Sequence, residues 1–279
     1  MSRLTPVVKW LLIANVGIFI LDYMILPTVL GLNLDRQPPP LVTFGAFAVQ
    51  SALFEGRIWE FITFQFLYAS VGHVLFNSIG IYFFGPWLER WWGSKKFVIY
   101  YLLCGVGGAA FFTLLMFLHI LPGDFQSAMV GASAGIYGIF VGVAVVAPNL
   151  RVMLLFPPIE LSMRQLAIAL LVISTGAILL GIGGNEGGEA GHLGGAIVGF
   201  FLMRHSHLLG GTRKPRIIRP PAFNTRSESK LRPRTRMQLD EDSAVDQILD
   251  KVSSQGFQSL TQDERDILQK ASERQHPDS

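Results

Sequence analysis

The stretch "MVGASAGIYGIF", residues 129–140, places Ser133 between glycines at the start of an apolar run. Soluble hydrolases carry a similar G-x-S-x-G on a sharp turn between a strand and a helix. Here the run continues to Pro148 without a charged residue, as in a membrane segment. The stretch therefore predicts a helical membrane protein, and the serine needs an explanation within one.

Charged residues are scarce and unevenly placed. They make up 15% of the 279 residues, whereas an ordinary soluble domain has about 25%. They concentrate after residue 203, which predicts a membrane-embedded body followed by a soluble tail. The single cysteine, Cys104, lies in an apolar run, and we expect it to be buried.

Six apolar segments approach the roughly 20 residues that a transmembrane helix needs. If all of them cross the bilayer, every lysine and arginine except Arg36 and Arg57 falls on one side. Basic loops face the cytoplasm, so we expect both termini there, in a bacterial inner membrane. The segments are residues 7–27, 71–88, 96–119, 133–148, 163–182 and 190–207.

The fourth segment is short. As a helix, residues 133–148 would span about 24 Å, which is less than the hydrocarbon core of about 30 Å. Non-helical backbone at membrane depth must line a wet cavity or be buried in protein. We therefore expect Ser133 at the floor of a water-filled pit that opens to the outer face.

Polar residues gather at three places near the predicted outer ends of these segments. Polar groups are costly inside a membrane, so each of them needs a reason. The three places are "GHVLFN" with His73 and Asn77, "GASAGIY" with Ser133 and Tyr137, and "GHLGG" with His192.

Each place has an ordinary explanation when it is taken alone. Serine is a common helix N-cap, and His192 would suit an interfacial position. His73 and Asn77 are spaced i, i+4 and share a helix face, so they would also suit a structural hydrogen-bonded pair. Together, the three places provide a nucleophile, a base and two side-chain donors.

These residue types suit acyl transfer. The hydroxyl of Ser133 needs a base to take its proton, and neutral His192 fits that role. The resulting oxyanion needs preorganised donors, which the Asn77 amide, a His73 nitrogen and the Ser133 backbone N–H can supply. Tyr137, one turn beyond the serine, would hold the imidazole by stacking.

The acids nearest to His192 in sequence are Glu186 and Glu189, within "GGNEGGEAGH". This glycine-rich composition is typical of a mobile loop, so neither carboxylate is expected to orient the imidazole. We therefore predict a Ser–His dyad rather than a triad.

Glycines recur at helical spacing beside these residues. In the last segment, a G-x-x-x-G places Gly195 and Gly199 on the same helix face as His192. Glycine lets helices approach closely in lipid, and packing alone would explain the pattern. A second stripe, in the fourth segment, consists of Gly131, Gly135, Gly138 and Gly142.

The motifs "GHVLFN", "GASAGIYG" and "GHLGGAIVG", with "FGPWLERWWGS" after the second segment, resemble the signatures of rhomboid intramembrane serine proteases. The resemblance covers roughly residues 5–207. It implies an all-α polytopic membrane protein, a bundle of six transmembrane helices that cleaves transmembrane proteins at or near their helices. It also implies that Ser133 is the nucleophile and His192 the base.

The resemblance assigns further roles. His73 and Asn77 would help to form the oxyanion hole, with Gly131 in support, and Tyr137 would pack on the ring of the catalytic histidine. The last segment would approach the fourth through Gly195 and Gly199.

The family's substrate gate would correspond to residues 163–182 and to the capping loop 183–190. The chain departs from the family in two places. Trp59 is followed by Glu60 where the family often has Trp-Arg, and Tyr68 stands where many members have histidine. Both departures concern the support of the loop and the site.

The tail divides into two parts after the transmembrane domain. Ten basic residues and four prolines lie between Arg204 and Arg236, which predicts a disordered linker on anionic lipids of the cytoplasmic leaflet. Nucleic-acid binding is not expected without aromatic interleaving or a fold. The predicted parts are a rhomboid domain (1–207), a basic proline-containing linker (208–239) and a small helical hairpin (240–279).

The hairpin would dock on a partner or self-associate, because two short helices alone are marginal. Its first helix has one apolar face, Gly256 would end it, and a capping box would start the second helix. The apolar face comprises Val245, Ile248, Leu249 and Val252, and the capping box comprises Thr261 and Glu264.

The leading hypothesis is an intramembrane serine endopeptidase that acts on single-span membrane proteins. The alternatives are a non-catalytic rhomboid-like protein that binds transmembrane helices, and a transporter, although the chain shows no half-repeat typical of one. Neither a metal nor a cofactor is expected, because His73, His119 and His192 lack partner ligands at useful spacing.

Overall fold

The computed structural model describes residues 4–154 and 158–209, and in the C-terminal part residues 247, 248, 251, 258 and 260–275. The chain divides into two units, Met1–Ile218 and Arg219–Ser279. The division predicted from sequence also separates a membrane part from a C-terminal part, but its boundaries at residues 207 and 239 remain predictions. Most of the predicted linker, residues 210–239, lies outside the described residues.

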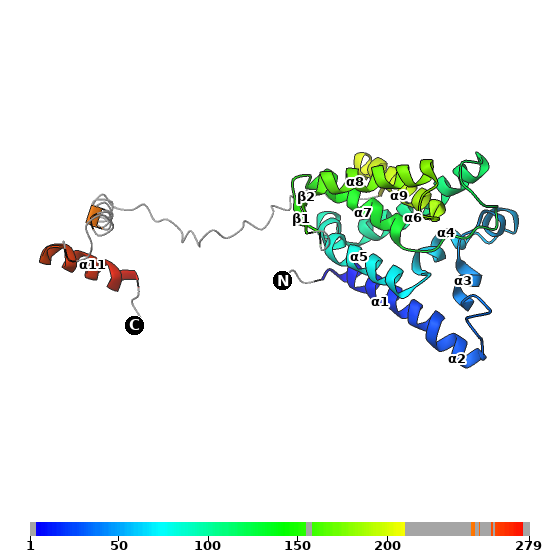
Figure 1. Cartoon of the computed structure of the whole chain (residues 1–279), viewed down its shortest axis with the longest axis horizontal. Coiled ribbons are helices and arrows are strands. Elements are labelled where there is room, and N and C mark those ends of the chain that lie inside the picture. The colour runs from blue at the N-terminus through cyan, green and yellow to red at the C-terminus, as the bar shows by residue number, and fades with distance from the viewer. Residues whose placement is uncertain are drawn as a thin grey trace. The chain divides into compact units, whose positions relative to one another are not determined.

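The first unit is built almost entirely of helices, which confirms the predicted helical class (Figure 1). A small antiparallel pair of strands, β1 (Arg151–Met153) and β2 (Glu160–Ser162), places Val152 opposite Leu161. The helices are α1 (Pro6–Ile20), α2 (Leu26–Leu30), α3 (Pro40–Gly45), α4 (Glu60–Thr63), α5 (Val71–Trp92), α6 (Ser94–Phe117), α7 (Ser133–Val146), α8 (Met163–Leu180) and α9 (Glu186–Arg204). Short π-helical turns occupy Leu21–Ile25 and Gln50–Phe54, and 3₁₀ turns occupy Phe64–Phe66 and Ser206–Leu209.

Each of the six predicted apolar segments contains one of the longer helices. Pro6–Leu30, Ser94–Phe117 and Met163–Leu180 are long and apolar enough to cross a membrane. Glu60–Phe66 and Val71–Trp92 meet this condition only as a pair, which is bent by 95°, and Ser133–Val146 is a shorter apolar helix. Six crossings therefore remain a prediction.

Local sequence explains where the helices that carry the site begin and end. Ser70 caps α5, because its hydroxyl accepts from the N–H of His73 over 3.2 Å. Ser162 and Gln165 form a capping box at the start of α8. That helix ends at Gly181, whose φ of 62° is the left-handed conformation that glycine adopts readily.

Two buried carboxylates bind the first helical segment to the rest of the unit. Glu89 of α5 accepts from the N–H groups of Val7 and Val8 over 2.9 and 3.0 Å. Asp22, in the π-helical turn after α1, accepts from the N–H of Leu41 over 2.6 Å, at the start of α3. The first N–H groups of a helix lack acceptors within the helix, and here side chains from distant segments supply them.

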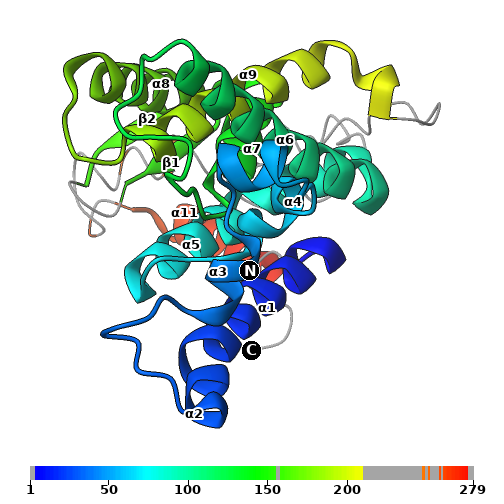
Figure 2. The ribbon, with the colours of Figure 1, turned by 90° about the vertical axis from the view of Figure 1, so that its right-hand side faces the viewer.

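The helix that carries the serine, α7, lies at the centre of the unit. It packs against α5, α6, α8 and α9, and both views place α1 and α8 on opposite sides of it (Figures 1 and 2). Cys104 is fully buried, as predicted, and its Sγ would lie 2.4 Å from a Cβ added at Gly138. Small residues thus let neighbouring helices press against α7.

The contact between α7 and α9 is made by backbone. A Cβ at Gly195 would lie 2.0 Å from the carbonyl oxygen of Ala134, and one at Gly199 would lie 2.8 Å from the Cα of Gly138. Neither position has room for a side chain. The backbones of the helices that carry Ser133 and His192 are therefore in direct contact.

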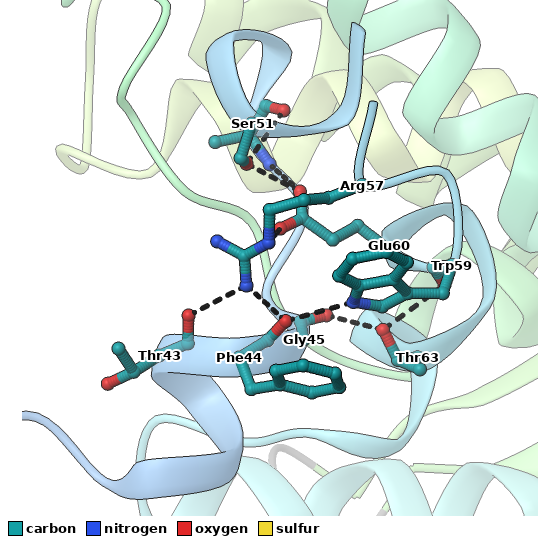
Figure 3. A network of polar contacts seen from close by, with 9 residues as sticks. Thr43, Phe44, Gly45, Ser51, Arg57, Trp59, Glu60 and Thr63 are labelled. Atoms are coloured by element: carbon teal, nitrogen blue, oxygen red, sulfur yellow. Dashed lines mark hydrogen bonds and ion pairs between the residues drawn. The ribbon is translucent and has the colours of Figure 1, made fainter. Parts of the chain in front are cut away.

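Arg57 holds the loop before α4 (Figure 3). Its guanidinium donates to the backbone oxygens of Thr43, over 3.1 Å, and Phe44, and its Nε lies 3.1 Å from Oε1 of Glu60. The indole of Trp59 also donates to the Phe44 oxygen, over 3.1 Å. The arginine thus lies two residues before the tryptophan instead of directly after it, and Glu60 serves as its buried partner.

The second unit contains the helix α11 (Gln262–Gln275). The predicted capping box is confirmed: the N–H of Thr261 donates to Glu264 over 2.8 Å, and the N–H of Glu264 donates to the threonine hydroxyl over 3.4 Å. Lys251 pairs with the same carboxylate at 2.8 Å, and Ile248 is buried. Val245, Leu249, Val252 and Gly256 lie outside the described residues.

Candidate active site

A cavity of about 270 Å³ lies between α5, α7 and the start of α9. The five side chains that the sequence predicts for chemistry all line it, although they come from three helices. Its lining comprises His73, Phe76, Asn77 and Gly80 of α5, Val130, Ser133, Ile136, Tyr137 and Phe140 of α7 and the residues before it, and Asn185, Gly188 and His192.

Ser133 is the first residue of α7 and is half-buried. The N-cap is Ala132, and no side chain caps this helix end, so the explanation of the serine as an N-cap is wrong. The serine N–H is among the first amides of the helix, which lack acceptors within it. A negative charge on or near this hydroxyl would therefore be favoured by the helix dipole.

His192 is held on two sides. Its ring stacks on that of Tyr137, with ring centres 4.2 Å apart and planes 12° from parallel. Its Nδ1 lies 3.0 Å from Oε2 of Glu189. When Nδ1 carries the proton and donates to this carboxylate, Nε2 is the unprotonated nitrogen, free to act as a base.

The contact with Glu189 corrects two predictions. Residues 186–189 are the first turn of α9 rather than a loop, so the helix begins four residues before the predicted segment and leaves a shorter cap before it. A carboxylate therefore does lie within hydrogen-bond distance of the imidazole of His192. The spacing of three residues places both side chains on one helix face, a signal that the glycine-rich composition obscured. Glu186, by contrast, is not among the residues that line the cavity.

Ser174 of α8 completes this side of the site, and no sequence motif indicated its role. Its hydroxyl is fully buried, donates to Oε2 of Glu189 over 2.5 Å and lies 3.3 Å from the hydroxyl of Tyr137. A carboxylate only accepts hydrogen bonds, so the shorter contact takes the serine proton. The two residues that hold the imidazole are thus joined through α8.

The opposite wall carries His73 and Asn77. Nδ1 of His73 accepts from the N–H of Ala69 over a long 3.4 Å, which leaves Nε2 as the protonated nitrogen. The ring also meets Tyr68 edge-on, with centres 5.2 Å apart. The amide of Asn77 donates to the backbone oxygen of His73 over 2.8 Å, which fixes both residues on one helix face.

Gly131 joins the two walls. Its φ of 121° suits glycine alone, and an added Cβ would lie 2.6 Å from Nε2 of His73 and 3.7 Å from Oγ of Ser133. The Gly131 N–H donates to the oxygen of Phe64 over 2.8 Å. That N–H is therefore engaged, and the contribution of Gly131 is the space that it leaves between the imidazole and the hydroxyl.

No three His, Cys, Asp or Glu side chains among residues 4–154, 158–209 and the described C-terminal positions lie close enough together to hold a metal ion. The arrangement offers a hydroxyl, an oriented imidazole and hydrogen-bond donors, which is the set that acyl transfer requires.

Comparisons with known proteins identify relatives of this chain. The chain is 30% identical over 161 residues to Rhomboid protease GluP of Bacillus subtilis (strain 168), an alignment that covers 58% of the chain and 28% of that protein. It is 28% identical over 179 residues to Rhomboid protease AarA of Providencia stuartii, covering 61% and 63%. The alignments thus span less than two thirds of these relatives.

Two family models match the chain. Residues 237–274 match a family of unknown function, DUF6576, and this stretch covers all of the described helix α11 except its last residue. Residues 55–206, more than half of the chain, match the Rhomboid domain. The chain is therefore an integral membrane protein that belongs to the rhomboid family.

Proposed function

We propose that the protein is an intramembrane serine endopeptidase in which Ser133 is the nucleophile and His192 the general base. The observation that supports this best is that both side chains line one cavity while the Nδ1 side of the imidazole is held by a carboxylate. The family membership and the relatives named as proteases support the same reaction class.

In the proposed reaction, Nε2 of His192 takes the hydroxyl proton of Ser133 as Oγ bonds to the carbonyl carbon of the substrate. The carbonyl electron pair moves onto oxygen. When this tetrahedral intermediate collapses, the C–N bond breaks and the imidazolium gives its proton to the departing amine. Water, activated by the same nitrogen, then hydrolyses the acyl-enzyme and frees the serine.

The oxyanion would be held by donors that the fold fixes in advance. We assign this role to Nε2–H of His73, the amide of Asn77 and the N–H of Ser133, with Gly131 providing room. Fixed donors stabilise a developing charge strongly, because they need no reorganisation during the reaction.

The side chains that line the cavity support a class of substrate. Apolar side chains of α5 and α7, among them Phe76 and Ile136, line it beside the polar groups. An unwound segment of a transmembrane helix would satisfy both kinds of surface. We propose single-span membrane proteins as substrates, cleaved near the outer face of a bacterial inner membrane by an enzyme with six crossings and cytoplasmic termini.

We also propose the three parts predicted from sequence as functional parts: a protease domain (1–207), a basic linker (208–239) that contacts anionic lipids, and a hairpin (240–279) that docks on a partner. The match of residues 237–274 to a separate family model supports the independence of the last part.

Labelling with a fluorophosphonate tests the proposal, because the reagent phosphonylates an activated serine. We expect labelling of the wild type in lipid, and labelling within background for Ser133→Ala and His192→Ala. Ser127→Ala and His205→Ala, two residues that do not line the cavity, serve as controls and should label like the wild type. Circular dichroism would verify that all variants fold.

Comparison of shed protein fragments from cells with the wild type or Ser133→Ala would then identify substrates. Fragments that appear with both chains alike, together with wild-type labelling of Ser133→Ala, would contradict the proposed nucleophile. A folded wild type that binds transmembrane helices yet neither labels nor sheds fragments would instead indicate a non-catalytic member of the family.

A further inference from the structure

Three residues from three helices form a connected chain beside the proposed base. Oε2 of Glu189 lies 3.0 Å from Nδ1 of His192 and accepts a 2.5 Å hydrogen bond from the hydroxyl of Ser174. Ser174 is fully buried and also lies 3.3 Å from the hydroxyl of Tyr137. The side chains of His192 and Glu189 are only 15% and 21% exposed, so little solvent screens the contact.

We propose that Glu189 is a positioning residue for His192, so that the site contains a Ser–His–Glu arrangement, and that Ser174 of α8 holds the carboxylate in place. This inference rests on the proposed function and adds to it the group that prepares the base.

The physical argument concerns the imidazole before and after proton transfer. Before transfer, the carboxylate accepts from Nδ1–H and so fixes the tautomer in which Nε2 is basic. After transfer, the imidazolium carries a positive charge next to the carboxylate, and this charge is stabilised where water is scarce. The proton remains on the imidazole throughout, because the role of the carboxylate is orientation and charge stabilisation.

The stacked ring and the carboxylate restrict different motions. Tyr137 lies parallel to the imidazole and limits tilting out of its plane, while Glu189 limits rotation within the plane. Ser174 touches the partners on both sides, and it belongs to α8 rather than to α7 or α9. A displacement of α8 would therefore loosen the carboxylate and with it the base.

The kinetic test uses the maximal labelling rate of Ser133 by a fluorophosphonate and the reagent concentration at half-maximal rate. We expect Glu189→Ala to lower the maximal rate on the order of ten- to a hundredfold, the range of one lost charge-assisted hydrogen bond, with the half-maximal concentration unchanged. Glu189→Asp should recover part of the loss. Ser174→Ala should cause a smaller loss of about threefold to tenfold.

Matched controls are available on the same helices. Glu186→Gln changes a second first-turn acid of α9 that does not line the cavity, and Thr175→Ala removes a hydroxyl of α8 that donates to the Leu171 oxygen in its own helix. Both should label at the wild-type rate. Equal losses in these controls would indicate a general effect on the helices and overturn the assignment.

A spectroscopic readout does not depend on activity. With ¹⁵N-labelled histidine, the Nδ1–H proton of His192 bound to a carboxylate should resonate far downfield, in the wild type and in Ser133→Ala alike. The resonance should move or disappear in Glu189→Ala and persist in Glu186→Gln. If it is unchanged in Glu189→Ala, or if that variant labels at the wild-type rate, the inference is wrong.

The two proposals fail in different ways. A folded wild type without labelling counts against the proposed endopeptidase, whereas the resonance still decides whether Glu189 holds His192. Labelling of the wild type with undiminished labelling of Glu189→Ala leaves the endopeptidase intact and removes the positioning role.

Discussion

At the scale of single residues, the site depends on a glycine, which has no side chain, as well as on reactive groups. Gly131 has a backbone conformation that side chains avoid, and it leaves room for the imidazole of His73 beside the hydroxyl of Ser133. A methyl group there would strain the backbone and occupy the space that the proposed oxyanion needs.

Gly131→Ala therefore tests this space. We expect a stability loss of about 1–3 kcal/mol from backbone strain and a fall in fluorophosphonate labelling, because the Cβ would lie 2.6 Å from Nε2 of His73. Gly56→Ala is the matched control: Gly56 also has a positive φ, 76°, but nothing lies within 4 Å of its added Cβ. It should lose stability and keep labelling, and equal labelling in both variants would refute the role of the space.

At the scale of helices, the site is fixed by the contact of α7 with α9. The resemblance to rhomboid proteases implied that contact, because it assigns Gly195 and Gly199 to the approach of the last segment to the fourth. What sequence could not show is that the partner of Gly195 is a backbone oxygen, that of Ala134. A backbone atom cannot move aside as a flexible side chain can.

Gly195→Ala should force the two helices apart. We expect a loss of about 1–3 kcal/mol or more from overpacking, together with lost labelling as Ser133 and His192 separate. Gly176→Ala on α8 has open space around the added Cβ and should be neutral or stabilising by up to about 1 kcal/mol. Thermal unfolding in detergent measures both. A Gly195→Ala protein as stable as Gly176→Ala would contradict the close contact.

The motifs predicted His73, Asn77, Ser133, Tyr137 and His192, which all line the cavity, because helical periodicity and polar placement are local signals. Glu189 was missed for a physical reason. Glycine disfavours a helix in isolation, but packing overrides this preference here, since Gly191 lies against Met129 and Gly187 against Phe112. The role of Ser174 could not be predicted from sequence, because it depends on Glu189 and Tyr137, which belong to other helices.

At the scale of the whole molecule, the chain combines a membrane unit with a C-terminal unit, and residues 237–274 of the latter match a different family model. In the described part of the second unit, Glu264 contacts both Lys251 and Thr261. Hydrogen bonds from Lys251 and from the N–H of Thr261 lower the pKa of this carboxyl below its ordinary range.

The lowered pKa predicts a pH dependence. A carboxyl whose pKa is depressed by folding contributes stability above its ordinary pKa of about 4.3, and this contribution is lost as the pH falls through the depressed value. Hydrogen exchange of amides 262–275 should therefore be faster in Glu264→Gln than in the wild type at pH 7, with the difference fading below about pH 4. Asp263→Asn controls for loss of charge in the first turn. A difference that persists at low pH would contradict the ion pair.

The hydrogen bonds between Glu89 and the first helix bear on which residues the membrane unit needs in order to fold. The match to the Rhomboid domain model starts at residue 55, well after α1, yet Val8 has no solvent exposure and its amide is one of two from α1 that donate to that carboxylate. A chain cut back to the matched residues would leave the buried carboxylate of Glu89 without the amides of Val7 and Val8. The smallest unit expected to fold therefore includes α1 and is longer than the matched residues 55–206.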